Sequence, residues 1–181
     1  MERITLNFQK PALRVALLGS LCALAIVGRI AMAPIPNVQP VTVLLMLIGL
    51  YFGAGWASVC SLVVVLVTNL FLGMGLWTFY QIAVWALIAA VTALLFRRRK
   101  NILLLTVWAV FTGYAYGFFV SLWSFQSFVS FNGGLGFWAY YLQGLVTVDT
   151  YHALGNGVFM WFLFPLFRRL FAAKQTEGTP Q

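Results

Sequence analysis

The sequence predicts an all-α fold: a polytopic membrane protein with six transmembrane helices and both termini in the cytoplasm. Of its 181 residues, 62% are hydrophobic and only 8% are charged, and the mean hydropathy is +0.94. A helix that crosses a hydrocarbon core about 30 Å thick needs roughly 20 apolar residues, so a chain of this length holds about six of them. No room is left for a soluble domain, and residues 1–181 are expected to form one transmembrane domain.

Three short clusters of cations define the expected orientation. One interrupts the apolar sequence as Arg97-Arg98-Arg99-Lys100, and the other two lie near the chain ends, between residues 3 and 14 and between residues 168 and 174. Lys and Arg accumulate in loops on the cytoplasmic side, so an even number of spans must separate each cluster from the next. The same bias explains the formal charge of +8 without a nucleic-acid partner.

The first four spans are expected at residues 11–32, 41–54, 57–72 and 79–96. Pro34 and Pro36 end the first span, because proline lacks an amide donor and disfavours helical geometry in the residue before it. Residues 40–73 are too many for one helix and few for two. A hairpin broken at Gly53-Ala54-Gly55 keeps the Arg97 cluster inside, so we expect two short or tilted helices there.

The last two spans are expected at residues 101–125 and 148–167. A turn at residues 73–78 precedes span four, a polar, glycine-rich loop follows span five at residues 126–136, and an amphipathic stretch occupies residues 137–147. The three loops assigned to the outside contain no charged residue, which agrees with the proposed orientation.

Apart from the basic clusters, three ionisable residues lie inside the expected spans: Arg29, Asp149 and His152. Ionisable groups are costly at membrane depth, so each is a candidate functional residue. Arg29 and Asp149 share a depth, and we expect them to form an ion pair that either clamps two helices or contacts a ligand. His152 and Asn156 follow Asp149 at i+3 and i+7, so one helix face carries all three. For His152, an interhelical hydrogen bond and ligand contact both remain open.

A second set of polar and aromatic residues is expected at the same depth, toward the outside. It contains amides, hydroxyls and two indoles from several spans: Asn37, Gln39, Thr42, Asn69, Trp77, Thr78, Gln81 and Trp85. A few placed polar groups in a mostly apolar setting are typical of a small-molecule pocket. With Asp149, His152 and Asn156, these residues form the predicted substrate-binding site.

On the first span, Ala12, Ala16 and Ser20 repeat every four residues, a small-residue ladder that lets another helix approach closely. The ladder serves either packing within the chain or a partner docking from the cytoplasmic side. Other signals are absent from the sequence. There is no GxxxxGK[ST] phosphate loop and no HExxH motif, and a single histidine with distant cysteines predicts no metal site of the chain's own.

Three segments resemble a known family. RIAMAPIPNVQPVT at residues 29–42, NLFLGMGLWTFYQ at residues 69–81 and DTYHALGN at residues 149–156 are similar to the S-components of energy-coupling factor (ECF) vitamin transporters, in particular the cobalamin type. The resemblance implies a six-helix subunit of the prokaryotic plasma membrane that captures a vitamin from outside. It also implies partners, namely a transmembrane coupling protein and two cytoplasmic ATPases that use the ATP.

The same resemblance implies docking through an alanine-rich pattern on the first helix, for which Ala12, Ala16 and Ser20 are the matching positions. The expected ligand is cobalamin or a related corrinoid. Either His152 would approach its cobalt, or the pocket would simply enclose its macrocycle. The chain itself is expected to be no enzyme and to carry no cofactor. The alternatives are an S-component for another vitamin, a membrane-embedded enzyme using Asp149 and His152 as an acid/base pair, and an assembly subunit without a ligand.

Overall fold

The computed structural model describes residues 11–98, 100–132 and 136–171, and all the regular secondary structure in these ranges is helical. The helices, in chain order, are α1 (Pro11–Ala31), α2 (Val41–Phe52), α3 (Ala54–Leu72), α4 (Trp77–Phe96), α5 (Ile102–Asn132), α6 (Phe137–Gly144), the π-helical segment η1 (Leu145–Asp149) and α7 (Thr150–Phe171). The predicted all-α fold is therefore confirmed.

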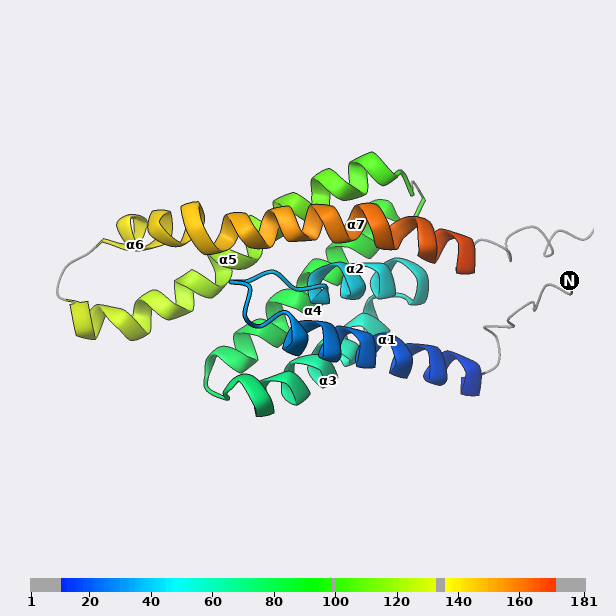
Figure 1. The fold of residues 1–181 in the computed structure, drawn as a ribbon, viewed down its shortest axis with the longest axis horizontal. Coiled ribbons are helices and arrows are strands. Elements are labelled where there is room, and N and C mark those ends of the chain that lie inside the picture. The colour runs from blue at the N-terminus through cyan, green and yellow to red at the C-terminus, as the bar shows by residue number, and fades with distance from the viewer. Residues whose placement is uncertain (1–10, 99, 133–135, 172–181) are drawn as a thin grey trace, which may run out of the picture.

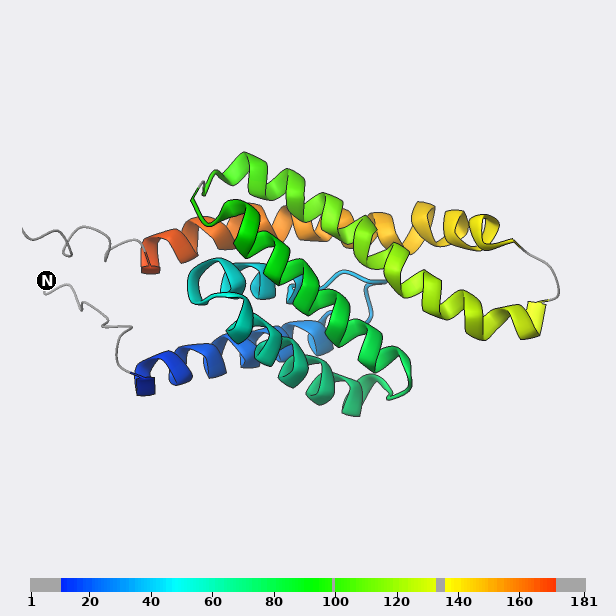
Figure 2. The same cartoon turned by 180° about the vertical axis from the view of Figure 1, so that it is seen from behind.

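The long helices run alternately along one axis of the bundle (Figure 1). The start of α1 and the end of α7 lie at one end, together with the α2–α3 turn and the passage from α4 to α5. The α1–α2 and α3–α4 connections, the end of α5 and the start of α6 lie toward the other end, as the view from behind also shows (Figure 2). The described members of the three basic clusters, Arg14, Arg97, Arg98, Lys100, Arg168 and Arg169, therefore border the same end, which we call the basic end.

The predicted break into two helices at Gly53 is present in the structure. Gly53 separates α2 from α3 with a φ of 97°, and its amide donates to the Gly49 carbonyl at the end of α2. Such a positive φ is accessible to glycine at little cost, so the helix ends and reverses there without strain. With 12 residues, α2 is about 18 Å long, which is shorter than a hydrocarbon core.

The short helix α2 forms the centre of the bundle. Every residue from Val41 to Leu50 is buried, and α2 contacts α1, α3, α4, α5 and α7. A helix that is apolar on all faces is stable only inside a larger structure. Because α2 is enclosed by its neighbours, its few polar atoms must find partners within the protein.

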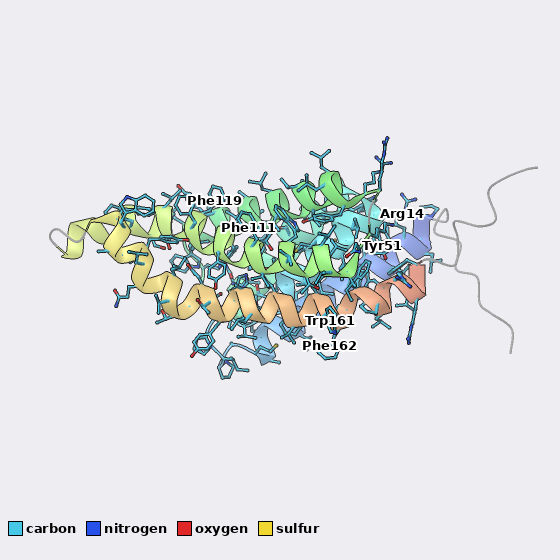
Figure 3. All side chains as sticks on the ribbon, turned by 90° about the horizontal axis from the view of Figure 1, so that it is seen from above. Arg14, Tyr51, Phe111, Phe119, Trp161 and Phe162 are labelled. Atoms are coloured by element: carbon cyan, nitrogen blue, oxygen red, sulfur yellow. The ribbon has the colours of Figure 1, made fainter. Side chains whose placement is uncertain are left out.

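Among the described residues, four helices are long and apolar enough to cross a membrane: α1, α3, α4 and the 102–125 part of α5. Large apolar side chains point outward, including Phe111 and Phe119 on α5 and Trp161 and Phe162 on α7 (Figure 3). An apolar exterior of this kind suits a hydrocarbon solvent. The fifth helix continues to Asn132, beyond its expected end, and the expected amphipathic stretch is helical as α6 and most of η1.

Glycine allows α5 and α7 to pack in close contact. A Cβ at Gly113 would lie 2.5 Å from the backbone Cα of Ala153, and a Cβ at Gly157 would lie 2.9 Å from the Val110 side chain. At Gly117 a Cβ would overlap the Asp149 carboxyl group. Small residues spaced by four let helix backbones approach in this way. The close contact brings the start of α7 into the bundle and places Asp149 against α5.

Candidate functional site

A buried polar layer crosses the bundle on the side away from the basic end. It draws one to three residues from each of the helices α1 to α5 and α7, and we define it by these members: Arg29, Thr42, Thr68, Asn69, Thr78, Gln81, Trp85, Tyr116 and His152. All of them are buried except Gln81, which is half-buried. Buried polar groups must be hydrogen-bonded to be tolerated. The hydrogen bonds within this layer therefore show which of its side chains already have partners.

The guanidinium of Arg29 contacts three neutral side chains. Its Nη1 donates to Thr68 Oγ1 at 2.6 Å, its Nη2 donates to Gln81 Oε1 at 3.4 Å, and its Cζ lies 5.0 Å from the centre of the Trp85 ring. Arg29 is only 8% exposed. A buried cation needs such partners, and a tryptophan face supplies part of the stabilisation that a carboxylate otherwise gives.

The predicted ion pair between Arg29 and Asp149 is not formed in this structure. Both residues are described, and no salt bridge joins their side chains. The ion pair was predicted from the position of each residue along its helix. That position says nothing about the direction in which the side chain points around the helix axis. Arg29 points to α3 and α4, where Thr68 and Gln81 lie. Asp149 points to Gly117 of α5 instead.

Asn69, Thr78 and Gln81 form a second set of bonds next to Arg29. Asn69 Nδ2 donates to Thr78 Oγ1 at 2.9 Å and to Gln81 Oε1 at 3.0 Å. The Gln81 carbonyl oxygen thus accepts from both Arg29 and Asn69. These bonds connect the end of α3 to the start of α4 and to α1, so the three predicted residues do come together.

The bonds of His152 define its protonation. The ring Nδ1 lies 2.8 Å from the Asn37 carbonyl oxygen, and a carbonyl only accepts, so Nδ1 carries the proton. The ring Nε2 lies 3.0 Å from Thr42 Oγ1, which itself accepts from Trp85 Nε1 at 2.9 Å. With Nδ1 protonated, the Thr42 hydroxyl can donate to Nε2, which gives a neutral imidazole with both nitrogens used. In this arrangement His152 connects the α1–α2 loop, α2 and α7.

Tyr116 belongs to the same layer, although sequence reasoning missed it. Its ring stacks on Trp85 with centroids 4.8 Å apart and lies 5.0 Å from the His152 ring. The three rings link α4, α5 and α7. An isolated tyrosine in an aromatic-rich span gives no sequence signal, but Gly113 and Gly117, four residues apart on the same helix, indicate the close helix contact that buries it.

The polar residues on the face at the start of α7 have fewer hydrogen-bond partners than those of the polar layer. Asp149 is 5% exposed, and its Oδ2 is buried without a hydrogen-bond partner. Asn156 Nδ2 donates to the Ala109 carbonyl at 3.3 Å, but its Oδ1 also has no partner. Two acceptor oxygens on one helix face are thus left without a donor among the described residues. An unmet buried carboxylate is costly, and such sites merit a functional explanation.

Asp149 is the last residue of the π-helical segment η1. The Thr150 hydroxyl donates to the Leu145 carbonyl, five residues earlier, at 2.7 Å, and it accepts from the Tyr114 hydroxyl at 3.4 Å. Single π turns inside α-helices are rare and are frequent at functional sites. The irregular turn and the unpartnered carboxylate therefore coincide.

The remaining predicted binding residues lie at the edge of the layer. The Asn37 side chain donates to the Val148 carbonyl at 3.3 Å, and Gln39 is 8% exposed. Trp77 is 36% exposed, and its ring lies 5.9 Å from that of Trp123, which is also 5.9 Å from Tyr80. These aromatic rings come from α4 and α5. A flat ligand could stack on their faces.

The small-residue ladder on α1 is on the outside of the bundle. Ala12, Ala16 and Ser20 are all exposed, and the Ser20 hydroxyl donates to the Ala16 carbonyl of its own helix. Packing within the described chain therefore does not use the ladder. Beside it, α1 and α3 border an apolar groove of about 340 Å³, whose lining includes Leu18, Gly19 and Cys22.

No group of three His, Cys, Asp or Glu side chains capable of holding a metal ion occurs within residues 11–98, 100–132 and 136–171. Compared with protein families, with curated proteins and with solved structures, the chain gives no match. The function proposed next therefore rests on the geometry of the polar layer and on the three segments at residues 29–42, 69–81 and 149–156.

Proposed function

We propose that this chain is the substrate-capture subunit of an ECF vitamin importer, with six spans and both termini in the cytoplasm. In this proposal it binds cobalamin or a related corrinoid from outside and delivers it through a transmembrane coupling protein and two cytoplasmic ATPases. An S-component for another vitamin is the alternative.

The observation that carries the proposal is the meeting of the three resembling segments in one place. Arg29 from residues 29–42, Gln81 from residues 69–81 and His152 from residues 149–156 all belong to the polar layer. Arg29 bonds to Gln81, and His152 bonds to Thr42 and to the Asn37 carbonyl. Segments that are separate in sequence and share one site in space support a common role in binding.

The distribution of charge supports the orientation. The helix ends next to the basic clusters all lie at one end of the bundle (Figure 1), and cytoplasmic loops are the ones enriched in Lys and Arg. The polar layer then lies toward the outside. A ligand arriving from the medium would meet the Trp77 and Trp123 rings first and the Asp149 carboxyl group further in.

The unmet acceptors suit a ligand that donates hydrogen bonds. Corrinoids carry peripheral carboxamides, whose N–H groups would pair with Asp149 Oδ2, and a broad macrocycle that stacks on aromatic rings. Because both ring nitrogens of His152 already have partners, we propose that it supports the wall of the site and does not bind cobalt. This assignment predicts that cobinamide, which lacks the lower base of cobalamin, binds as well as cobalamin does.

Calorimetric titration of the purified chain with cobalamin, cobinamide, biotin, folate, riboflavin and thiamine tests the proposal. We expect saturable binding of corrinoids at one site per chain, with the ligand recovered unchanged by mass spectrometry. Binding of a different vitamin instead would select the alternative. A converted product would indicate the acid/base enzyme that Asp149 and His152 suggested, and no binding to any of the six would overturn the proposal.

The docking role of the α1 ladder is tested by Ala16→Leu. A leucine there would keep a partner helix from approaching closely, so we expect loss of assembly with the coupling module while the isolated subunit still binds its ligand. Leu24, an exposed residue elsewhere on α1, gives a matched control as Leu24→Ile. Assembly that survives in Ala16→Leu would exclude this face as the docking surface.

The orientation is tested by labelling a cysteine introduced as Arg98→Cys. The two native thiols are buried, so an impermeant maleimide should report position 98 alone. We expect no labelling of intact cells and full labelling after permeabilisation. Labelling of intact cells would place the basic end outside and would contradict the proposed topology.

A further inference from the structure

A cavity opens at the basic end of the bundle, and none of its lining residues belongs to the polar layer. It has a volume of about 600 Å³ and lies between the α2–α3 turn and the last turns of α4. Its walls are mostly small or apolar, with Leu50, Phe52, Ala90, Ala93 and Leu94 among the lining residues, and one charged side chain, Arg97, also lines it. This volume falls in the range of small-molecule sites.

Backbone packing explains why the cavity is there. A Cβ at Gly49 would lie 2.6 Å from the Ala89 carbonyl oxygen, so α2 and α4 touch at this level. One turn further on, α2 ends and the chain reverses at Gly53, whereas α4 continues to Phe96. Nothing in the described chain fills the space beside this last part of α4. Ala90, Ala93, Leu94 and Arg97 share that helix face, since they are spaced by three and four residues.

The surroundings of the cavity are strongly cationic. Tyr51 lines it, and the Lys100 ammonium lies 4.3 Å from the centre of the Tyr51 ring. A neighbouring cavity of about 200 Å³ is lined by Arg14 together with Tyr51 and Phe52, and Figure 3 shows Arg14 and Tyr51 close to the end at which the chain termini leave the bundle. Burial lowers the pKa of the half-buried Lys100 ammonium, so a nearby anion would favour its charged form.

The chain does not contain enough acidic residues to neutralise this end. It has 11 Lys and Arg residues but only three Asp and Glu residues, of which Asp149 lies at the other side of the bundle, against Gly117. Glu2 and Glu177 lie outside the described residues, and even if both paired here, side-chain carboxylates would be fewer than the cations. The C-terminal ends of α2 and α4 carry only partial negative charges, and the partial positive charge at the N-terminal end of α3 offsets part of them.

We propose that this cavity binds an anionic phospholipid of the surrounding leaflet, with the phosphate group at Arg97 and an acyl chain along α4. Charge alone would suit any phosphate, but a lining that combines apolar side chains with polar atoms suits an amphiphile. Away from Arg97 the α4 surface is exposed and apolar, with Leu94 80% and Leu87 51% exposed. Basic pockets between helices on the cytoplasmic side are typical headgroup sites. The site is separate from the vitamin site and does not depend on it.

Native mass spectrometry of the purified full chain tests the proposal, with phosphatidylglycerol and phosphatidylcholine of identical acyl chains as probes. We expect preferential retention of phosphatidylglycerol. Arg97→Gln should weaken that retention about fivefold, as expected for one headgroup cation. The control Arg98→Gln removes the same charge from a residue that does not line the cavity, and it should change retention little.

A second pair of variants tests the cavity without changing any charge. Ala93→Phe fills it, whereas Ala83→Phe adds the same ring to an exposed site on α4 outside it. We expect Ala93→Phe to abolish selective retention and Ala83→Phe to preserve it, with similar thermal unfolding midpoints showing that both fold.

Three outcomes would overturn the inference. Equal retention of the two lipids would exclude headgroup recognition. Equal losses in Arg97→Gln and Arg98→Gln, with no effect of Ala93→Phe, would indicate diffuse attraction to a charged surface. Displacement of the lipid by millimolar inorganic phosphate would identify a free-anion site in place of a lipid site.

Discussion

Two buried charges, Arg29 and Asp149, are treated differently by this fold. The Arg29 guanidinium is bonded to Thr68 and Gln81 and lies over the Trp85 ring. The Asp149 carboxylate packs against Gly117, and its Oδ2 has no partner. The cation is therefore part of the bonded framework, whereas the anion is the group that still lacks a donor.

The difference separates structural residues from candidate binding residues within one polar layer. Residues on the Arg29 side, including Thr42 and His152, use their hydrogen-bonding groups on one another, so changing them should mainly affect folding. Asp149 lies in an irregular turn and makes few bonds, so changing it should mainly affect ligand binding. Substitutions on the Arg29 side should therefore cost more stability than substitutions at Asp149.

Arg29→Met should cost the most stability. It removes two hydrogen bonds made by a charged group, which are worth about 1.5–3 kcal/mol each, while relief of the buried charge offsets part of that. We expect a loss of about 3 kcal/mol in the free energy of unfolding, measured by titration with a denaturing detergent. Asp149→Asn should cost less than about 1 kcal/mol, because no hydrogen bond to its carboxyl group is present among the described residues.

The double mutant sharpens this first prediction. If the two residues are independent, the costs of Arg29→Met and Asp149→Asn should add within about 0.5 kcal/mol. A coupling energy well above that would mean that Arg29 and Asp149 interact after all. The comparison on which the division rests would then fail.

Thr42→Val should come next, with a loss of about 2 kcal/mol. Valine matches the shape of threonine but leaves Trp85 Nε1 and His152 Nε2 buried without a partner, and each unmet group costs about 1–3 kcal/mol. Thr42→Ser keeps the hydroxyl and is the matched control. Equal unfolding midpoints for the Val and Ser variants would show that the chain of bonds through Thr42 contributes little.

Gly113→Ala should destabilise by roughly 1–3 kcal/mol, the usual range for overpacking. The added methyl group would meet the backbone of Ala153, which cannot rotate away. Gly19 offers a control on α1, because a Cβ there would meet nothing within 4 Å, and Gly19→Ala should leave stability unchanged or raise it slightly. Similar behaviour of the two variants would argue against close α5–α7 packing.

Sequence reasoning predicted the path of the chain better than the contacts across it. Charge parity predicted the hairpin at Gly53, because the constraint acts on whole helices. The ion pair of Arg29 with Asp149 was wrong, because position along a helix gives depth but not direction around the axis. Thr68 is a better partner only because it lies on the face of α3 turned toward α1, which the sequence does not reveal.

Other features had no local signal. Tyr116 is buried because Gly113 and Gly117 draw α5 against α7, and that contact depends on residues some 40 positions away in sequence. The π turn ending at Asp149 is equally hard to predict, since it arises from the fit of α6 and α7 against α5. The predicted binding residues with the clearest pattern, Asn69, Thr78 and Gln81, are the ones that bond to one another as neighbours.

Gly117→Ala should have the smallest effect on stability and a large effect on binding. Its methyl group would overlap the carboxyl end of the Asp149 side chain, which can turn aside, unlike the backbone that opposes Gly113. We expect a stability loss below about 1 kcal/mol and at least a tenfold weaker corrinoid affinity by calorimetry, the equivalent of about 1.4 kcal/mol. Asp149→Asn, which leaves the site open but removes the charge, should weaken binding less than Gly117→Ala. Unchanged affinity in both variants would mean that the unpartnered carboxylate does not face the ligand, and the division between a bonded framework and an open binding residue would have to be abandoned.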